Sequence, residues 1–153
     1  MIRKMKKEDA EIFFNMAELF YASDAVMHPI PQKYHVDTFK EIMRCNTYLE
    51  GYIFEFEQKP VGYAILTKTF SHEAGGITLW IDEIYVSKEY RSKGLGKKFF
   101  KFLEETLDSS IVRLRLEVES DNERAIKLYK NMGFKKLEYD QMFQERTHNE
   151  EIS

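Results

Sequence analysis

A short basic run with two glycines constrains this chain more than any other segment. The run, Arg91–Gly96 (RSKGLG), follows the apolar stretch Thr78–Val86 and opens the segment Gly94–Leu107, whose apolar residues recur at helical spacing. Glycines let a backbone turn sharply, and a helix start leaves several N–H groups without partners. The sequence therefore predicts a strand, a turn and a helix whose N-terminus binds phosphate oxygens. Three basic side chains can contact the same anion: Arg91, Lys93 and Lys97.

The distribution of charge supports an anion site in this region. Lys88–Lys101 contains six basic residues and one acidic residue, a net charge of +5, whereas the whole chain carries −3. The remainder therefore carries −8, which favours a small cationic partner and argues against a general nucleic-acid binder. A basic segment is often only the solvated face of a helix, but the adjacent glycines favour an anion site.

Two familiar phosphate-binding motifs do not fit the run. A Walker A loop would need Gly where Arg91 stands and Ser or Thr where Lys98 stands. A dinucleotide-binding fingerprint would need a third glycine where Phe99 stands. A phosphate site of another kind is therefore expected.

Length and composition predict one globular domain over residues 1–153, with a frayed polar tail at 147–153. No apolar run approaches the roughly 20 residues that a membrane helix needs, and the first residues are too charged for a signal peptide. Cys45 is the one cysteine, so no internal disulfide forms and a reducing cytoplasm fits. The four histidines lack zinc-ligand spacing, so no metal is expected.

The periodicity of apolar residues predicts an α+β fold with helices on both faces of a mixed sheet. Asp24–Tyr34, which contains two prolines, is expected to be a loop. Helices are expected at Lys6–Ala22, Asp37–Cys45 with Asp37 as N-cap, Gly94–Leu107, and from Asp121 or Asn122 to Met132. Strands are expected at Ile2–Met5, Tyr48–Glu57, Val61–Phe70, Thr78–Val86, Val112–Val118, Lys135–Tyr139 and Gln141–Arg146.

Three segments together resemble the GNAT acetyltransferases. The run Arg91–Gly96 is similar to the pyrophosphate loop of that family, R/Q-x-x-G-x-G/A. Upstream, Ile84–Val86 resembles the family's fourth strand. Downstream, Asn122–Phe134 resembles its segment N-x-x-A-x-x-x-Y-x-x-x-G-F. The resemblance covers Trp80 to Phe134, and before it only the order of elements matches.

The resemblance implies a mixed, mostly antiparallel sheet of six to seven strands, splayed between strands four and five, with acetyl-CoA as co-substrate in the splay. The residues it assigns to the cofactor are Ile84, Tyr85, Val86, Arg91, Ser92, Lys93, Gly94, Leu95, Gly96, Lys97, Asn122, Ala125 and Tyr129. The backbone N–H of Val86 is expected to stabilise the oxyanion, since that charge needs a preorganised donor.

Tyr129 is the general acid that the resemblance implies, near the cofactor sulfur. A thiolate with a pKa of about 8.5 can take a proton from a phenol with a pKa of about 10. The alternative is a packed tyrosine with a satisfied hydroxyl. Asn122 can cap its helix, and the resemblance adds a contact to the pantetheine arm.

Three acids are candidates for the base that removes a proton from an ammonium substrate. Asp82 and Glu83 point to opposite faces of a strand, so one of them is expected to face the substrate. Glu83 is preferred and Glu117 is second. Each could instead form a structural ion pair with Arg113 or Arg115.

The acceptor pocket is expected to include Tyr21, His28 and Tyr34 of the loop-rich segment, together with Asp82 and Glu83, although packing roles are the alternative. The sequence thus predicts an N-acetyltransferase that moves an acetyl group from acetyl-CoA to a primary amine of a small, cationic molecule in a ternary complex. A non-catalytic acyl-CoA-binding module, or an acetyltransferase of protein N-termini or lysines, is the alternative. Many GNAT relatives form dimers, so a homodimer is an open expectation.

Overall fold

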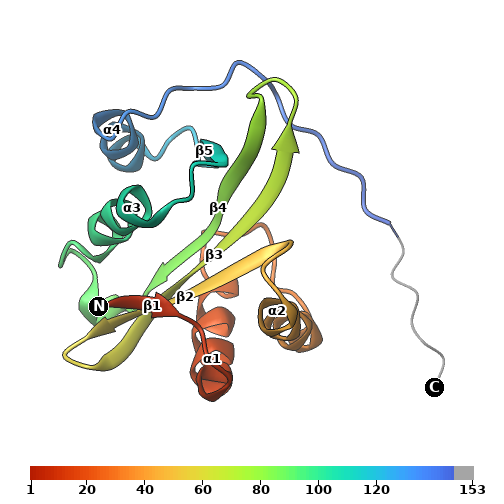
Figure 1. Cartoon of the computed structure of the whole chain (residues 1–153). Coiled ribbons are helices and arrows are strands. Elements are labelled where there is room, and N and C mark those ends of the chain that lie inside the picture. The colour runs from red at the N-terminus through yellow and green to blue at the C-terminus, as the bar shows by residue number, and fades with distance from the viewer. Residues whose placement is uncertain (147–153) are drawn as a thin grey trace. The chain divides into compact units, whose positions relative to one another are not determined.

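Five strands form one sheet in the order β1-β2-β3-β4-β5 (Figure 1). The computed structural model describes residues 1–146 in two compact units, Met1–Glu117 and the part from Val118 on, and the sheet belongs to the first. All neighbouring strands are antiparallel except β4 and β5, which are parallel. The strands are β1 Ile2–Lys4, β2 Leu49–Phe56, β3 Lys59–Ser71, β4 Gly76–Val86 and β5 Ile111–Leu116.

Helices cover both faces of this sheet, which confirms the predicted fold class. Helices α1 (Ala10–Tyr21) and α2 (Gln32–Arg44) lie on one face, and α3 (Leu95–Thr106) lies on the other. The second unit contains α4 (Glu123–Asn131). None of the helices within residues 1–146 is long and apolar enough to cross a membrane.

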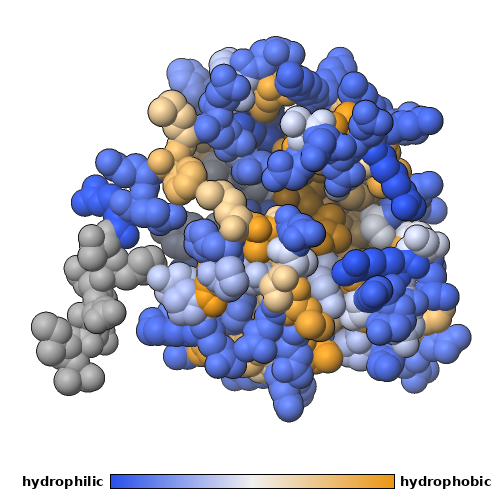
Figure 2. Space-filling model, turned by 180° about the vertical axis from the view of Figure 1, so that it is seen from behind, coloured by the Kyte–Doolittle hydropathy of each residue, from blue (hydrophilic) through white to orange (hydrophobic). Residues whose placement is uncertain are grey.

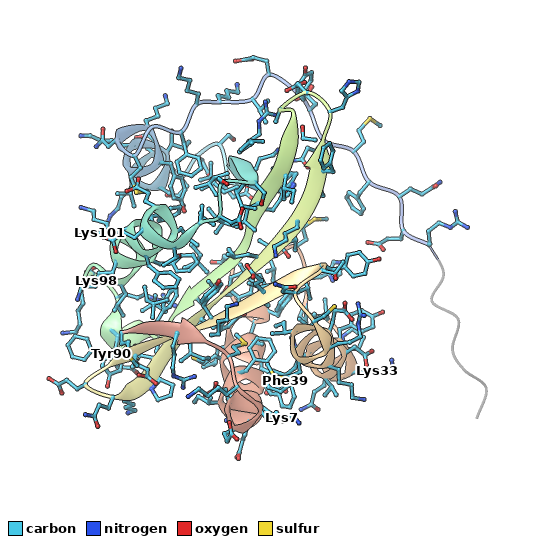
Figure 3. All side chains as sticks on the ribbon, viewed as in Figure 1. Lys7, Lys33, Phe39, Tyr90, Lys98 and Lys101 are labelled. Atoms are coloured by element: carbon cyan, nitrogen blue, oxygen red, sulfur yellow. The ribbon has the colours of Figure 1, made fainter. Side chains whose placement is uncertain are left out.

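Alternation along β2 fills the two hydrophobic layers. Ile53 packs into the core with α1 and α2, where the Phe13 and Phe39 rings lie 5.8 Å apart. Phe39 points from α2 into this layer (Figure 3). Its neighbour Phe54 contacts Phe99 of α3 on the opposite face, with ring centroids 5.2 Å apart. Burial of these rings fixes the register of β2, because a slip by one residue would exchange the layers.

The sheet opens at the middle of β4. Pairing of β4 with β5 runs from Ile77 to Ile81, and the rest of β4 pairs with β3 alone. The β3 register jumps from Glu83 to Ile81, so Asp82 is the extra residue of a β-bulge. A bulge bends the strand and re-aims side chains, and here it lies where β5 leaves. This is the predicted splay between the fourth and fifth strands.

Two predictions about secondary structure were wrong. Helix α2 begins at Gln32 after Pro31, and Asp37 lies inside it in an ion pair with Lys33 rather than at the N-cap. Pro31 is the N-cap of α2, so the loop ends earlier than Tyr34.

The two last predicted strands, Lys135–Tyr139 and Gln141–Arg146, are absent, so the sheet has five strands rather than six or seven. The predicted tail at 147–153 lies outside the described residues. Alternation shows which face of a strand would be apolar, but a strand also needs a hydrogen-bonding partner. Met142 and Phe143 remain 97% and 71% exposed.

Surface character follows the composition. Seen from behind, the molecule is mainly hydrophilic, with hydrophobic side chains gathered toward the middle of that face (Figure 2). Lys98 and Lys101 project from the outer side of α3 (Figure 3). The basic segment is therefore partly the solvated helix face that charge patterning allows.

Candidate active site

The glycine-containing loop leads from β4 into α3. Ser92 and Gly94 have positive φ angles of 63° and 77°, which curl the backbone so that successive N–H groups can converge on one anion. Gly94 is the N-cap of α3, and the first helical bond runs from Lys98 N to Gly94 O. The N–H groups in the first turn of α3, before Lys98, therefore lack helical partners. A Cβ added at Gly96 would meet no protein atom within 4 Å, so its backbone is open to close approach.

Basic side chains surround this loop. Arg91, Lys93 and Lys97 are all exposed. The Lys93 ammonium lies 5.3 Å from the centre of the Phe56 ring, and Arg91 Nε donates a 2.9 Å hydrogen bond to Val86 O. Arg91 thus links the loop to the end of β4. This arrangement of N–H groups and cations could hold an anion, and its use for a pyrophosphate stays a prediction.

The end of β4 carries backbone groups that pair with no second strand. Ser87 N donates to Val61 O of β3, and Tyr85 pairs with Tyr63. Because alternate residues of a strand direct their N–H and C=O groups to opposite sides, Ile84 and Val86 direct theirs away from β3. The Arg91 contact on Val86 O agrees with this assignment. Since β5 no longer accompanies β4 there, these groups can pair with an extended ligand.

A pocket of about 390 Å³ lies along this edge. One wall is the end of β4 with Arg91, and the other is the end of α1 with the chain after it. Its volume suits a small ligand with few polar contacts. The residues that line it are Phe20, Ser23, Asp24, Ala25, Ile84, Tyr85, Val86 and Arg91.

Glu83 lies one residue before this wall and is only 8% exposed. Its carboxylate accepts hydrogen bonds from the hydroxyls of Tyr21 and, at 3.2 Å, Tyr63. Burial, partly offset by the Tyr21 hydrogen bond, raises the pKa of Glu83 to about 7, with a further rise from the Asp82 charge. A carboxylate that titrates near neutrality is suited to general-base catalysis.

The other two acids lie together on the more exposed side. Asp82 and Glu117 are both exposed, whereas Glu83 is buried. Partial desolvation, followed by the Glu117 charge, raises the pKa of Asp82. Because Asp82 is the extra residue of the bulge, simple alternation does not apply there, and the opposite orientation of Asp82 and Glu83 stays a prediction.

The basic residues proposed as alternative partners of these acids are engaged elsewhere. Arg113 pairs with Glu73 at 3.1 Å, and the Arg115 guanidinium lies 4.2 Å from the centre of the Trp80 ring. The structure therefore gives these arginines other roles.

Helix α4 of the second unit carries the remaining predicted cofactor residues. Asn122 is its N-cap, and Asn122 Oδ1 accepts a 3.2 Å hydrogen bond from Ala125 N, which confirms the capping role. The Tyr129 ring packs against Phe134, with centroids 5.8 Å apart, and partial burial raises the pKa of Tyr129. Their contacts to a cofactor stay predictions.

The three predicted acceptor residues outside β4 lie at different places in the structure. Tyr21 reaches Glu83, as described above. His28 is exposed and contacts Pro29 O at 3.0 Å, and Tyr34 lies in α2. Neither of these two lines the 390 Å³ pocket. Within residues 1–146, no three side chains gather that could hold a metal ion.

Sequence reasoning missed two residues that the topology brings to the site. Tyr63 reaches Glu83 from β3, and Asp24 lines the pocket from the loop after α1. Tyr63 lies in an apolar strand pattern, which indicates burial but not a hydroxyl partner. Asp24 begins a loop whose course the sequence does not specify.

Comparison with known proteins agrees with this geometry. The family model described as "Acetyltransferase (GNAT) family" matches residues 13–134. The chain therefore belongs to the GNAT acetyltransferase family.

Two curated relatives match about half of the chain. The thialysine N-epsilon-acetyltransferase of Bos taurus is 38% identical over 78 residues, which cover 50% of this chain and 45% of that protein. The spermine/spermidine N(1)-acetyltransferase of Bacillus subtilis is 31% identical over 83 residues, which cover 52% of this chain and 55% of that protein. The chain thus spans about half the length of the curated relatives it matches.

Solved structures share the whole fold. A possible acetyltransferase from Clostridium difficile 630 has a TM-score of 0.81 and 23% identity, covering 97% of this chain and 98% of that one. The aminoglycoside acetyltransferase AAC(6')-Iy, solved with a bisubstrate analogue of CoA, has a TM-score of 0.77 and 16% identity. The match covers 96% of this chain and 98% of that one. At these identities the likeness shows the fold alone.

Proposed function

We propose that this protein transfers an acetyl group from acetyl-CoA to a primary amine of a small, cationic molecule by direct attack in a ternary complex. The observation that carries the proposal is the free edge of β4 at Ile84–Val86. This edge lines a pocket together with Arg91 of the phosphate-type loop, and it directly follows the buried Glu83. The cofactor would supply an activated acetyl thioester. The chain supplies binding, orientation and proton transfer.

Cofactor binding would use three parts of this chain. The N–H groups of the loop and α3 start, with Arg91 beside them, suit the pyrophosphate. The backbone groups of Ile84 and Val86 can pair with the amides of an extended pantetheine arm. Val86 N–H is then placed to donate to the thioester oxygen as that oxygen gains negative charge.

Proton removal from the acceptor would end on Glu83. Because Glu83 is buried and accepts from Tyr21, the proton would pass through the Tyr21 hydroxyl. Tyr21 takes a proton from the ammonium as it gives its own to Glu83, so the free amine forms without an ionised phenol. Burial and the Glu83 charge raise the pKa of Tyr21, which keeps that hydroxyl protonated at rest. Tyr129 is our proposed acid for the leaving thiolate.

Acidic side chains favour a cationic acceptor. Asp24 lines the pocket, and Asp82 and Glu117 lie together near the splay. The named activities of the relatives, on thialysine and on spermine or spermidine, are consistent with an amine acceptor.

A free-thiol assay tests this function. The protein would be mixed with acetyl-CoA and a panel of polyamines, aminoglycosides, amino acids and short peptides, and CoA release would be followed. We expect release with a small-amine class and a loss of roughly 100-fold in kcat/KM for Glu83→Gln, because a general base contributes about that factor. Glu104→Gln, an exposed change on α3, is the matched control and should retain activity.

Other outcomes separate the alternatives. Reaction with peptides alone would replace the small-molecule acceptor by a protein one. Binding of acetyl-CoA without thiol release from any acceptor would favour a non-catalytic acyl-CoA-binding module.

A further inference from the structure

A second, smaller pocket lies beside the first, across the last turn of α1. Phe20 and Ser23 line the large pocket, whereas Tyr21 and Ala22 line the small one, which measures about 150 Å³. Its walls come from the end of α1 and the start of α2, so it belongs to neither the loop nor the β4 edge described above. The residues that line it are Glu18, Tyr21, Ala22, Pro29, Ile30, Gln32 and His35.

His35 is a largely buried polar side chain that lines this pocket. It is 4% exposed, and within residues 1–146 its ring nitrogens accept or donate no hydrogen bond. Its ring packs against Tyr21, with centroids 5.4 Å apart. Burial lowers the pKa of His35, against a smaller opposite effect of the Glu18 charge. The neutral imidazole has one ring nitrogen that can accept a hydrogen bond.

Glu18 gives the same pocket a negative charge. Its side chain is exposed on α1, and in the described part of the chain it forms no ion pair. It lies close enough to His35 for its charge to affect that imidazole. Ala22, Pro29 and Ile30 add apolar walls. An acceptor nitrogen, a carboxylate and apolar walls together suit an alkylammonium group.

We propose that this pocket is a second subsite for the acceptor, which binds the distal ammonium group of a diamine while the other amine is acetylated. The distal ammonium donates to His35 and pairs with Glu18, and its methylene groups pack against Pro29 and Ile30. This proposal rests on the proposed amine acetylation and specifies which amines the site prefers.

Tyr21 links the small pocket to Glu83. Its hydroxyl contacts Glu83, where the reacting amine loses its proton, and its ring faces His35 and the small pocket. A diamine that passes along this side chain would place its two nitrogens at the two ends of Tyr21. A monoamine would leave the His35 end without a partner.

The test compares n-alkylamines with α,ω-diamines of equal chain length, by kcat/KM for CoA release. The wild type should prefer the diamine at one or more lengths. Glu18→Gln should reduce the diamine-to-monoamine ratio about tenfold, since it removes a charge-assisted contact. Glu11→Gln, also exposed on α1 but outside the pocket, is the matched control and should keep the ratio.

The outcomes distinguish this proposal from the function on which it rests. If no amine of either series releases CoA, the proposed function fails. If amines react but diamines have no advantage, or if Glu18→Gln keeps the wild-type ratio, the function stands and the second subsite is refuted. A lower diamine-to-monoamine ratio of kcat/KM in Glu18→Gln, with the wild-type ratio kept in Glu11→Gln, supports the subsite.

Discussion

Removing the Tyr63 hydroxyl should move the pH profile of the reaction without disturbing the fold. Tyr63 is fully buried, and its ring packs against Phe13 and Tyr85 at centroid distances of 5.1 and 5.8 Å. Tyr63→Phe keeps these contacts and removes one hydrogen bond to Glu83. That bond lowers the pKa of Glu83, because it favours the charged carboxylate. Its loss therefore raises the pKa.

The size of the change follows from the hydrogen bond. A bond to a charged group contributes about 1.5 kcal/mol, and 1.36 kcal/mol corresponds to about one pKa unit. If Glu83 is the base, the acid limb of kcat/KM lies near its pKa of about 7 and moves by about one pH unit to higher pH in Tyr63→Phe. The plateau at high pH should stay close to wild type, because the carboxylate and Tyr21 remain.

The assay is CoA release as a function of pH, with Tyr52→Phe as the control. Tyr52 is similarly buried but packs against Phe102 of α3, on the other face of the sheet. Its profile should match wild type. An unmoved acid limb in Tyr63→Phe, or an equal shift in both variants, would refute the argument that Tyr63 positions and tunes Glu83.

Three further changes test the fold and the site. The stability of Glu83→Gln relative to wild type should rise as pH increases from about 4.5 to about 7. The folded pKa of Glu83 is raised above its ordinary value, so the wild type loses up to about 3 kcal/mol of unfolding free energy over that window, as denaturant unfolding at several pH values would show. A stability difference between the two proteins that does not change with pH would contradict the raised pKa. Phe99→Ala should cost about 3 to 5 kcal/mol in the same measurement, because Phe99 is fully buried between α3 and β2, whereas a cost under 1 kcal/mol would contradict that packing. Asn122→Ala should weaken α4 by about 1 kcal/mol through loss of its cap, measured by hydrogen exchange of its amides, and unchanged protection would contradict the cap.

Local patterns predicted most of the elements correctly. The strand that ends at Val86 and the helix that follows the loop occupy nearly the predicted residues, because alternation and helical spacing act over a few residues. Aspartate is a good helix cap, which predicts a helix start at Asp37, but α2 begins earlier, with Pro31 as its N-cap. The last two strands failed because pairing is a property of two segments, which one alternating segment does not reveal.

The site was predictable where a motif lies in one stretch of chain, as in the loop Arg91–Gly96. It was not predictable where separate elements meet. Tyr63 lies 20 residues before Glu83 and joins it only through strand pairing. His35 and Glu18 share a pocket only because α1 and α2 pack together. No spacing rule connects such residues, so they became visible only in the folded chain.

Calorimetric titration with acetyl-CoA shows whether the free β4 edge and the basic loop form an acyl-CoA site. We expect saturable one-to-one binding, weakened about tenfold by Arg91→Ala, which would remove the proposed charged contact to the pyrophosphate and removes the bond to Val86 O. Lys101→Ala, on the outer side of α3, should bind as wild type. An absence of acetyl-CoA binding to the folded wild-type protein would mean that the β4 edge and the basic loop form no acyl-CoA site.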